Sequence, residues 1–209
     1  MLVTSLVAWA QPIAVAAKTL KFVYAGPKIP KTLHGELLVA AQDAGDIFEK
    51  KDCPEDVPCA FQLTMQEPIL LYSQDSTRIT FKQDVAAIEE ATGGDVVVTE
   101  RIDPNACPDE SLGVGRILGC ADGYGRWVMI TRDTRAIMGV TLAHELGHAR
   151  GLPHRCILRA LMNPVYAPEN RALDRWECDQ LHNPLTNPLR KESSCEQNKT
   201  RRKIGHLER

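Results

Sequence analysis

Hydrophobic and polar residues follow strand and helix periods along most of the chain. Runs rich in β-branched, apolar and aromatic residues predict strands over 19–26, 59–66, 68–73, 95–102, 114–118 and 126–133. The second and third runs fit either two strands or one bent strand. Apolar residues at helical spacing predict helices over 34–51, 81–94, 137–150 and 170–182. This order of elements predicts an α+β fold with an α/β-like amino-terminal subdomain that holds a sheet and two long helices.

The two ends of the chain differ in character from its middle. Residues 1–17 are mostly apolar and end in small residues, which predicts a secretory signal segment; the alternative is a packed or frayed amino terminus. The same segment is too short and too interrupted for a stable membrane span. Residues 188–209 are charged and poor in apolar side chains, which predicts a flexible tail. We therefore expect one domain over 18–187, with an upper part to about residue 151 and a lower part over 152–187.

Composition narrows the range of partners. Hydrophobic residues make up 44% of the 209 residues and the formal net charge is −2, so no strong attraction to nucleic acid or to a membrane surface is implied. A basic run at 198–203 is typical of a solvated tail. We expect a monomer that binds no nucleic acid.

Seven cysteines are present, and none of them forms a C-x-x-C pair of the kind that binds structural zinc. Their close spacing predicts three local disulfides and leaves Cys195 over. The predicted pairs are Cys53 with Cys59, Cys107 with Cys120, and Cys156 with Cys178. Disulfides persist in oxidising compartments, which agrees with a secreted or periplasmic protein. The alternative is a cytosolic protein with free thiols.

The segment "TLAHELGHARGLPH" gathers three of the six histidines into eleven residues. His144 and His148 are four residues apart on a predicted helix and therefore share one face. Gly151 tolerates positive φ, so the chain can reverse there and return His154 to the same point. Three neutral imidazoles with an open fourth position are typical of a catalytic zinc site, and Glu145 lies beside them as a candidate base. The pattern arises by chance in fewer than about one in ten thousand chains of this length.

The pattern H-E-x-x-H-x-x-G-x-x-H, followed by the run "ALMNPVY", resembles the zinc signature and Met-turn of the metzincin metalloproteases. The second run is similar to the matrixin branch in particular. The resemblance implies that Met162 lies in a tight turn beneath the metal, although its spacing also fits ordinary core filling. It implies that Pro164, Val165 and Tyr166 line the pocket for the substrate side chain after the cut bond. Tyr166 is assigned to this wall rather than to catalysis.

The resemblance also carries an expectation for the fold and for substrate binding. It implies a twisted mixed sheet, a zinc-bearing helix, and a small carboxy-terminal subdomain with the Met-turn and a final helix. In such a fold, the edge strand binds an extended peptide or protein substrate by strand addition. The residues assigned to this strand are Val114, Gly115, Arg116, Ile117 and Leu118. An ordinary interior strand is the alternative.

The chain also departs from the matrixin pattern. It contains no Pro-Arg-Cys-Gly latency motif, and the remaining histidines are scattered, so a second structural zinc is unsupported. Calcium sites are common in the family, but none can be identified in this sequence. Cys156 lies two residues after His154 and is close enough in sequence to bind the metal. The disulfide to Cys178 is the favoured alternative.

These observations predict a zinc-dependent endopeptidase with one catalytic Zn²⁺. Glu145 is expected to take a proton from the attacking water and to return it to the leaving amine. Two alternatives stay open: a secreted binding domain that keeps zinc only for stability, and a cytosolic zinc peptidase or toxin with free thiols.

Overall fold

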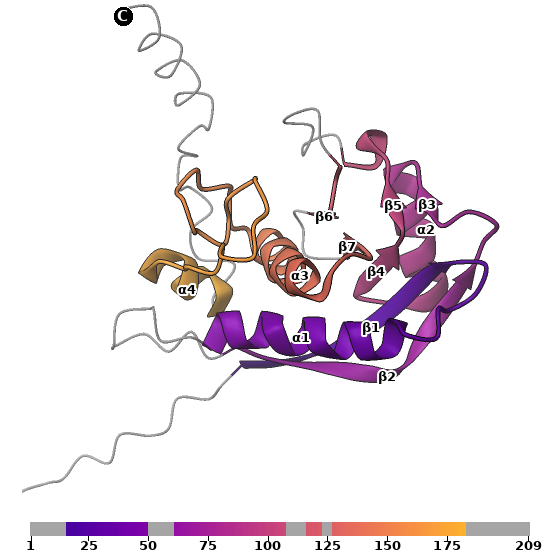
Figure 1. Cartoon of the computed structure of the whole chain (residues 1–209), viewed down its shortest axis with the longest axis horizontal. Coiled ribbons are helices and arrows are strands. Elements are labelled where there is room, and N and C mark those ends of the chain that lie inside the picture. The colour runs from indigo at the N-terminus through magenta and orange to yellow at the C-terminus, as the bar shows by residue number, and fades with distance from the viewer. Residues whose placement is uncertain (1–15, 50–60, 108–115, 123–126, 183–209) are drawn as a thin grey trace, which may run out of the picture.

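The computed structural model describes residues 16–49, 61–107, 116–122 and 127–182, and Figure 1 shows how their elements are arranged. The main sheet has five strands in the order β2-β1-β4-β7-β6. Its strands are β1 (Ala16–Gly26), β2 (Phe61–Ser73), β4 (Val96–Thr99), β6 (Gly119–Ala121) and β7 (Val128–Thr131). Four of them run parallel, and β6 runs antiparallel to β7 at one edge. The structure thus has the twisted mixed sheet that the resemblance implies, and most of its strands are parallel.

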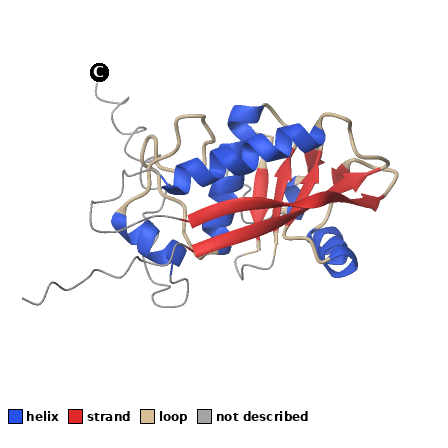
Figure 2. Ribbon diagram, turned by 90° about the horizontal axis from the view of Figure 1, so that it is seen from below, coloured by secondary structure: helices blue, strands red, loops and turns tan. Residues whose placement is uncertain are grey.

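Two long helices cover one face of this sheet, α1 (Leu33–Glu49) and α3 (Arg135–Ala149). A further helix, α2 (Lys82–Thr92), packs against the opposite face of the sheet, as Figure 2 shows. Alternate strand residues point to opposite faces, so each strand contributes to two separate hydrophobic cores. In β4, for example, Val96 and Val98 face α1 and α3, whereas Val97 faces α2.

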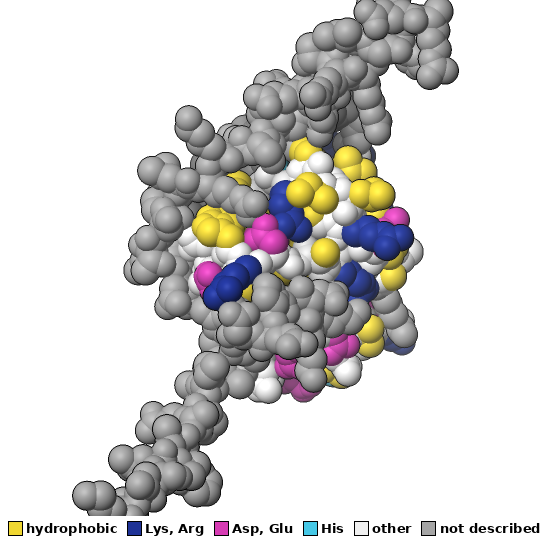
Figure 3. Space-filling view, turned by 90° about the vertical axis from the view of Figure 1, so that its left-hand side faces the viewer, with side chains coloured by type: hydrophobic (Ala, Val, Ile, Leu, Met, Phe, Trp, Pro, Cys, Tyr) yellow, Lys and Arg dark blue, Asp and Glu magenta, His cyan; other side chains and the backbone are white. Residues whose placement is uncertain are grey.

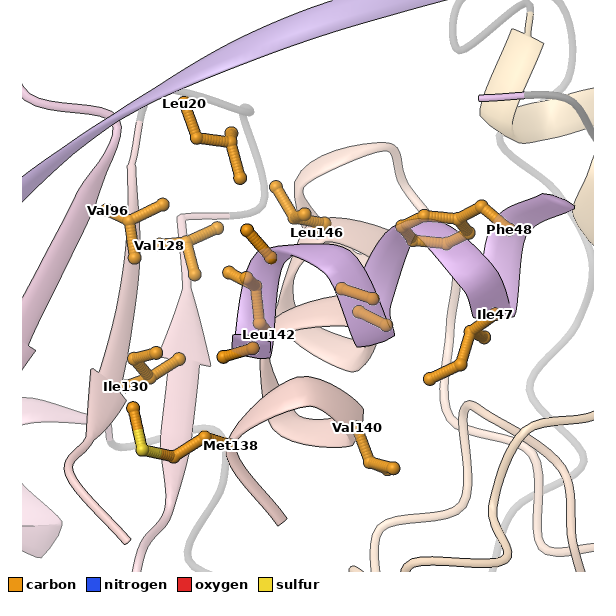
Figure 4. Close-up of a cluster of buried hydrophobic side chains, with 14 of the residues drawn as sticks. Leu20, Ile47, Phe48, Val96, Val128, Ile130, Met138, Val140, Leu142 and Leu146 are labelled. Carbon is orange, nitrogen blue, oxygen red and sulfur yellow. The ribbon is translucent and has the colours of Figure 1, made fainter. Parts of the chain in front are cut away.

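The larger core joins the sheet to α1 and α3. Figure 4 shows Leu142 and Leu146 of α3 directed between Val128 of β7 and helix α1. These side chains are at most 5% exposed. Burial of this apolar surface is the main favourable contribution to the upper part of the fold. It also fixes the rotation of α3 about its own axis, and with it the direction of the polar side chains on the opposite face.

The segment predicted as one strand over 95–102 divides in two. The chain leaves the main sheet at Glu100, and β5 (Arg101–Ile102) pairs with β3 (Arg78–Ile79) in a separate two-stranded sheet. The reason is tertiary, because Arg132 and Tyr24 hydrogen-bond the Glu100 side chain at this point. In contrast, 61–66 and 68–73 belong to one strand, β2, with a register irregularity opposite the segment between Lys21 and Val23, while residues 59 and 60 of the first predicted strand lie outside the described part.

Beyond α3 the chain is mostly irregular until the final helix α4 (Arg175–His182), which lies at the opposite end of the molecule from α2 (Figures 1 and 2). The helix predicted over 170–182 is shorter than expected, since Ala172 forms a β-bridge with Ala160 and Asp174 begins the cap. In that cap Asp174 accepts a hydrogen bond from the Glu177 amide (2.9 Å), and Glu177 accepts one from the Asp174 amide (2.7 Å).

Some predictions on the chain ends and the cysteines concern residues outside the described part of the chain, and others can be compared with the structure. Of the signal-like segment 1–17, only the last two residues are described, and they begin β1. The tail 188–209 and the pair Cys53–Cys59 lie outside the described part. Cys107 is bonded to Cys120, with their Cα atoms 6.0 Å apart. Cys156 and Cys178 are both disulfide-bonded, which rules out metal ligation by a free Cys156 thiolate; their direct link stays a prediction.

The charged residues of the surface reflect the nearly equal numbers of basic and acidic residues in the sequence. On the face seen in Figure 3, the coloured residues intersperse basic and acidic side chains with hydrophobic ones. Among the described residues, no helix has both the length and the hydropathy needed to cross a bilayer.

Candidate metal centre

Helix α3 supplies the first part of the centre. It presents His144 and His148 one turn apart on the same face, and both His144 and Glu145 are fully buried. The helix ends at Ala149, and Gly151 then adopts a φ of 82°, a left-handed conformation that favours glycine. This reversal returns His154 to the two helical histidines, as the sequence predicts.

The three imidazoles converge on one point. The Nε2 atom of His148 lies 3.0 Å from Nε2 of His144 and 3.1 Å from Nε2 of His154. Two nitrogens that each lie about 2.0 Å from a tetrahedral zinc ion are about 3.3 Å apart, which is close to the observed spacing. This is the one group of three or more potential metal-binding side chains found among the described residues. The donor set and its geometry therefore fit a zinc ion.

Backbone carbonyls orient two of the rings. The Nδ1 atom of His144 donates to the Leu161 carbonyl (2.7 Å), and that of His148 donates to the Leu152 carbonyl (2.8 Å). Each bond places the ring proton on Nδ1 and leaves Nε2 free to bind a metal. The carbonyl of Leu161 belongs to the segment before the Met-turn, so the lower part of the molecule orients a ligand carried by the upper part.

The electrostatics of the centre favour neutral imidazoles. Burial, together with His148 and His154 nearby, holds the pKa of His144 well below its usual value. Burial and His154 lower the pKa of His148 to about 4. Metal binding requires the neutral ring, so at neutral pH both residues are in the form that binds a metal.

Glu145 lies in a closely packed corner between α3, the edge strand and the Met-turn loop. The Tyr166 hydroxyl donates a hydrogen bond to Glu145 Oε1, and the Tyr166 ring lies 4.8 Å from the His144 ring. On the other side, a Cβ atom added to Gly119 would lie 2.6 Å from Glu145 Oε1. The carboxylate therefore occupies space that any other residue at position 119 would fill.

Met162 packs directly beneath the helix that carries the histidines. It is fully buried, and a Cβ atom added to Gly147 would lie 2.6 Å from its sulfur. Gly147 lies between His144 and His148 on α3, so its lack of a side chain allows the methionine to reach the underside of the centre. Met162 thus lies against the helix that carries two of the histidines, and its role as a Met-turn residue stays a prediction.

The segment 164–166 borders the centre, but its residues point in different directions. Val165 is 73% exposed, whereas Tyr166 turns inward onto Glu145. Two asparagines fix this arrangement: Asn163 accepts from the Val165 amide (2.9 Å), and Asn170 donates to the Val165 carbonyl (2.6 Å). The contact of Tyr166 with Glu145 was not predicted, because the sequence assigned this tyrosine to the pocket wall alone.

The predicted edge strand requires a correction. The strand at this edge is β6, so it begins at Gly119 rather than within 114–118. Val114 and Gly115 lie outside the described residues. Arg116, Ile117 and Leu118 precede the strand, and Ile117 forms a single bridge with Ile102 and packs against the smaller core. This packing directs the segment away from the edge until Leu118, whose carbonyl accepts from the Thr131 amide (2.7 Å).

Gly119 and the two asparagines are the residues that the sequence analysis missed. A glycine beside a predicted strand was the one available signal for a close approach. Asn163 and Asn170 gave no signal, since asparagine is common in loops and their partners are backbone groups brought near by the fold.

Similarity to known proteins is found in the fold and not in the sequence. No family model matches the chain, and no curated protein matches it in sequence. Among solved structures, it is similar to archaemetzincin from Methanopyrus kandleri, with 14% identity and a TM-score of 0.51 over 84% of this chain and 99% of that one. This likeness shows a common fold and confirms the metzincin-type fold class predicted from the sequence.

Two further structures match less well. They are metalloproteinase-II from Bacteroides fragilis (14% identity, TM-score 0.45, 84% of this chain and 56% of that one) and a zinc-dependent peptidase from Methanocorpusculum labreanum (10% identity, TM-score 0.40, 76% and 92%).

Proposed function

We propose that this chain is a zinc-dependent endopeptidase of the matrixin-like kind. The observation that carries the proposal is the convergence of three Nε2 atoms at zinc-ligand spacing directly beside a buried carboxylate. His144, His148 and His154 would hold the ion, and a fourth position would be left for water and substrate. Zinc bound there supplies a Lewis acid that activates water and polarises the scissile carbonyl.

The residues of the chain carry the proton transfers. Glu145 takes a proton from the attacking water and returns it to the nitrogen of the leaving amine. Its hydrogen bond with Tyr166 and its contact with Gly119 hold the carboxylate in one orientation, which keeps the base aligned between the two transfers.

Substrate binding follows from the edge of the sheet. Strand β6 has β7 on one side and is the last strand of the sheet, so its outer backbone groups suit the addition of an extended peptide. Pro164 and Val165 border the centre on the other side and form part of the wall for the side chain after the cut bond. The matrixin-like assignment of this wall rests on the "ALMNPVY" pattern.

We also propose that the protein acts outside the reducing cytosol. The disulfide between Cys107 and Cys120 and the disulfide-bonded state of Cys156 and Cys178 support this location. They argue against the cytosolic alternative with free thiols. The buried carboxylate at Glu145 argues against a binding domain with purely structural zinc, because a structural site has no use for a base.

The test is cleavage of a diverse peptide library, with cut sites identified by mass spectrometry with and without a zinc chelator. We expect cleavage that the chelator abolishes. Glu145→Gln should lower kcat/KM by about 10²–10⁴-fold, the usual contribution of a general base, while zinc stays bound. The matched control is Glu67→Gln, a carboxylate 64% exposed and paired with His34, which should keep full activity. Wild-type activity in zinc-loaded Glu145→Gln protein would refute the mechanism.

A further inference from the structure

Arg155 follows the third histidine directly and is an unusually buried arginine, with 12% of its side chain exposed. Its Nη1 atom donates to Asp174 (2.6 Å) and lies 3.1 Å from Oε2 of Glu177, which is 2% exposed. Its Nη2 atom donates to the Ala172 carbonyl (3.4 Å). Such a charge is costly to bury, and both terminal nitrogens of Arg155 have partners here, whereas its Nε atom has none among the described residues.

The partners of Arg155 already form the cap of α4. Glu177 Oε2 accepts from the Asp174 amide, and Asp174 Oδ1 accepts from the Glu177 amide. These two hydrogen bonds orient both carboxylates independently of the arginine. The cap therefore offers a fixed pair of anions, which Nη1 contacts together, while Nη2 donates to the Ala172 carbonyl.

Two hydrogen-bond routes lead from this cluster to the metal-binding rings. The backbone amide of Arg155 donates to the Met162 carbonyl (2.7 Å), which ties the loop of His154 to the Met-turn. The Ala172 carbonyl accepts from the Leu161 amide as well (2.8 Å), and the Leu161 carbonyl in turn receives the Nδ1 proton of His144.

We propose that Arg155 is a positioning residue for the zinc ligands: through its buried ion pair with the cap of α4, it fixes the loop that carries His154 and the carbonyl that orients His144. The inference rests on the proposed zinc function. Arg155 contacts neither the ion nor the substrate. It holds the three imidazole rings in the arrangement that binds zinc. Its loss should therefore reduce zinc affinity more than it reduces the stability of the fold.

The experiment measures the zinc dissociation constant by competition with a chromophoric chelator, on purified protein whose folding is verified by circular dichroism. Arg155→Met keeps most of the side-chain volume and removes the charge. We expect zinc affinity to fall about 10–100-fold, the usual effect of losing a group that orients a metal ligand. The matched control is Arg132→Met, which breaks an ion-pair cluster with Glu36 and Glu100 that shares no residue with the Arg155 cluster, and it should bind zinc like the wild type.

Arg155→Lys keeps the inference testable if the methionine variant does not fold. Lysine retains the charge but lacks the planar fork, so an intermediate loss of zinc affinity is expected. Affinity within twofold of the wild type in the folded Arg155 variants would overturn the inference, and so would an equal loss in Arg132→Met. A wild-type protein that does not bind zinc would instead refute the proposed function.

Discussion

The upper and lower parts of the molecule reach the same centre by different physical means. Up to the end of α3, regular strands and helices enclose two hydrophobic cores, and this part supplies His144, Glu145 and His148. From residue 150 to α4 the described chain has little regular structure, yet it supplies His154, Met162 and Tyr166. The same site is thus built half from helix geometry and half from individual polar contacts.

The difference shows what each part depends on. A helix packed on a sheet holds its side chains in place through many small apolar contacts, so no single residue decides the arrangement. The irregular segment adds a few side chains to the larger core, such as Leu161 and Met162, and is also held by specific bonds, such as Arg155 with Glu177. We expect changes to the buried apolar side chains of α3 to affect stability most, and changes to the groups around Glu145 and His154 to affect the site most.

The largest effect should follow from a cavity in the upper core. Leu142→Ala removes a fully buried side chain of α3 and should lower the free energy of unfolding by about 2–5 kcal/mol. Leu158→Ala, in the lower part, removes a side chain that is 80% exposed and should change the free energy of unfolding by less than about 0.5 kcal/mol. Denaturant unfolding of both metal-free variants measures the difference. Equal losses would contradict the burial of Leu142 in the larger core.

Acid should destabilise the metal-free protein through the histidines. The pKa of His148 is lowered to about 4 in the folded state from an ordinary 6.5, so below pH 6.5 the unfolded chain takes up a proton that the folded chain does not. The stabilisation is complete above pH 6.5 and is lost as the pH falls to about 4, by about 3 kcal/mol for this residue.

Thermal unfolding between pH 7.5 and 4 tests this dependence. His148→Gln should flatten the slope. An unchanged slope in His148→Gln would show that the destabilisation comes from other groups.

A methyl group at Gly119 should disturb the base without removing the metal. Its Cβ atom would lie 2.6 Å from Glu145 Oε1 and 2.8 Å from Thr141 Cγ2, so the carboxylate has to move. Gly119→Ala should lower kcat/KM about 100-fold, as expected for a displacement of about 1 Å, with zinc affinity unchanged. Gly35→Ala is the control, because no atom lies within 4 Å of its added Cβ and activity should be retained. Full activity in Gly119→Ala would show that Glu145 tolerates another position.

The smallest expected effect on stability comes from the ion pair of Arg171, in the lower part, with Asp43 of α1. Arg171 donates to both carboxylate oxygens of Asp43, at 2.7 and 2.9 Å, and also to the Pro168 carbonyl. Both side chains are about a quarter exposed, so a double-mutant cycle of Arg171→Met with Asp43→Asn should give a coupling of about 1 kcal/mol. A coupling near zero would mean that the loop does not depend on α1.

Much of the fold was predictable because the relevant signals are local. The periods of Val96–Thr99 and of α3 identify their element types, and the spacing of His144, His148 and His154 with Gly151 identifies a metal centre before any coordinates are known. Strand ends were less predictable. The departure of β5 from the sheet and the start of β6 at Gly119 depend on Glu100 and Ile117 finding partners elsewhere.

The sequence by itself determined the element order, the three histidines of the candidate metal centre, the carboxylate of Glu145 beside them and the spacing of the bonded pair Cys107–Cys120, because each of these depends on residue type and short-range geometry. Only the tertiary structure decided that Tyr166 turns onto Glu145, that Gly119 makes room for that carboxylate, and that Arg155 joins the His154 loop to α4. These contacts join residues up to 26 positions apart, from Gly119 to Glu145, and they exist because the core fixes where α3 lies. Periodicity describes one element at a time, whereas the packing of elements against each other is a property of the whole chain.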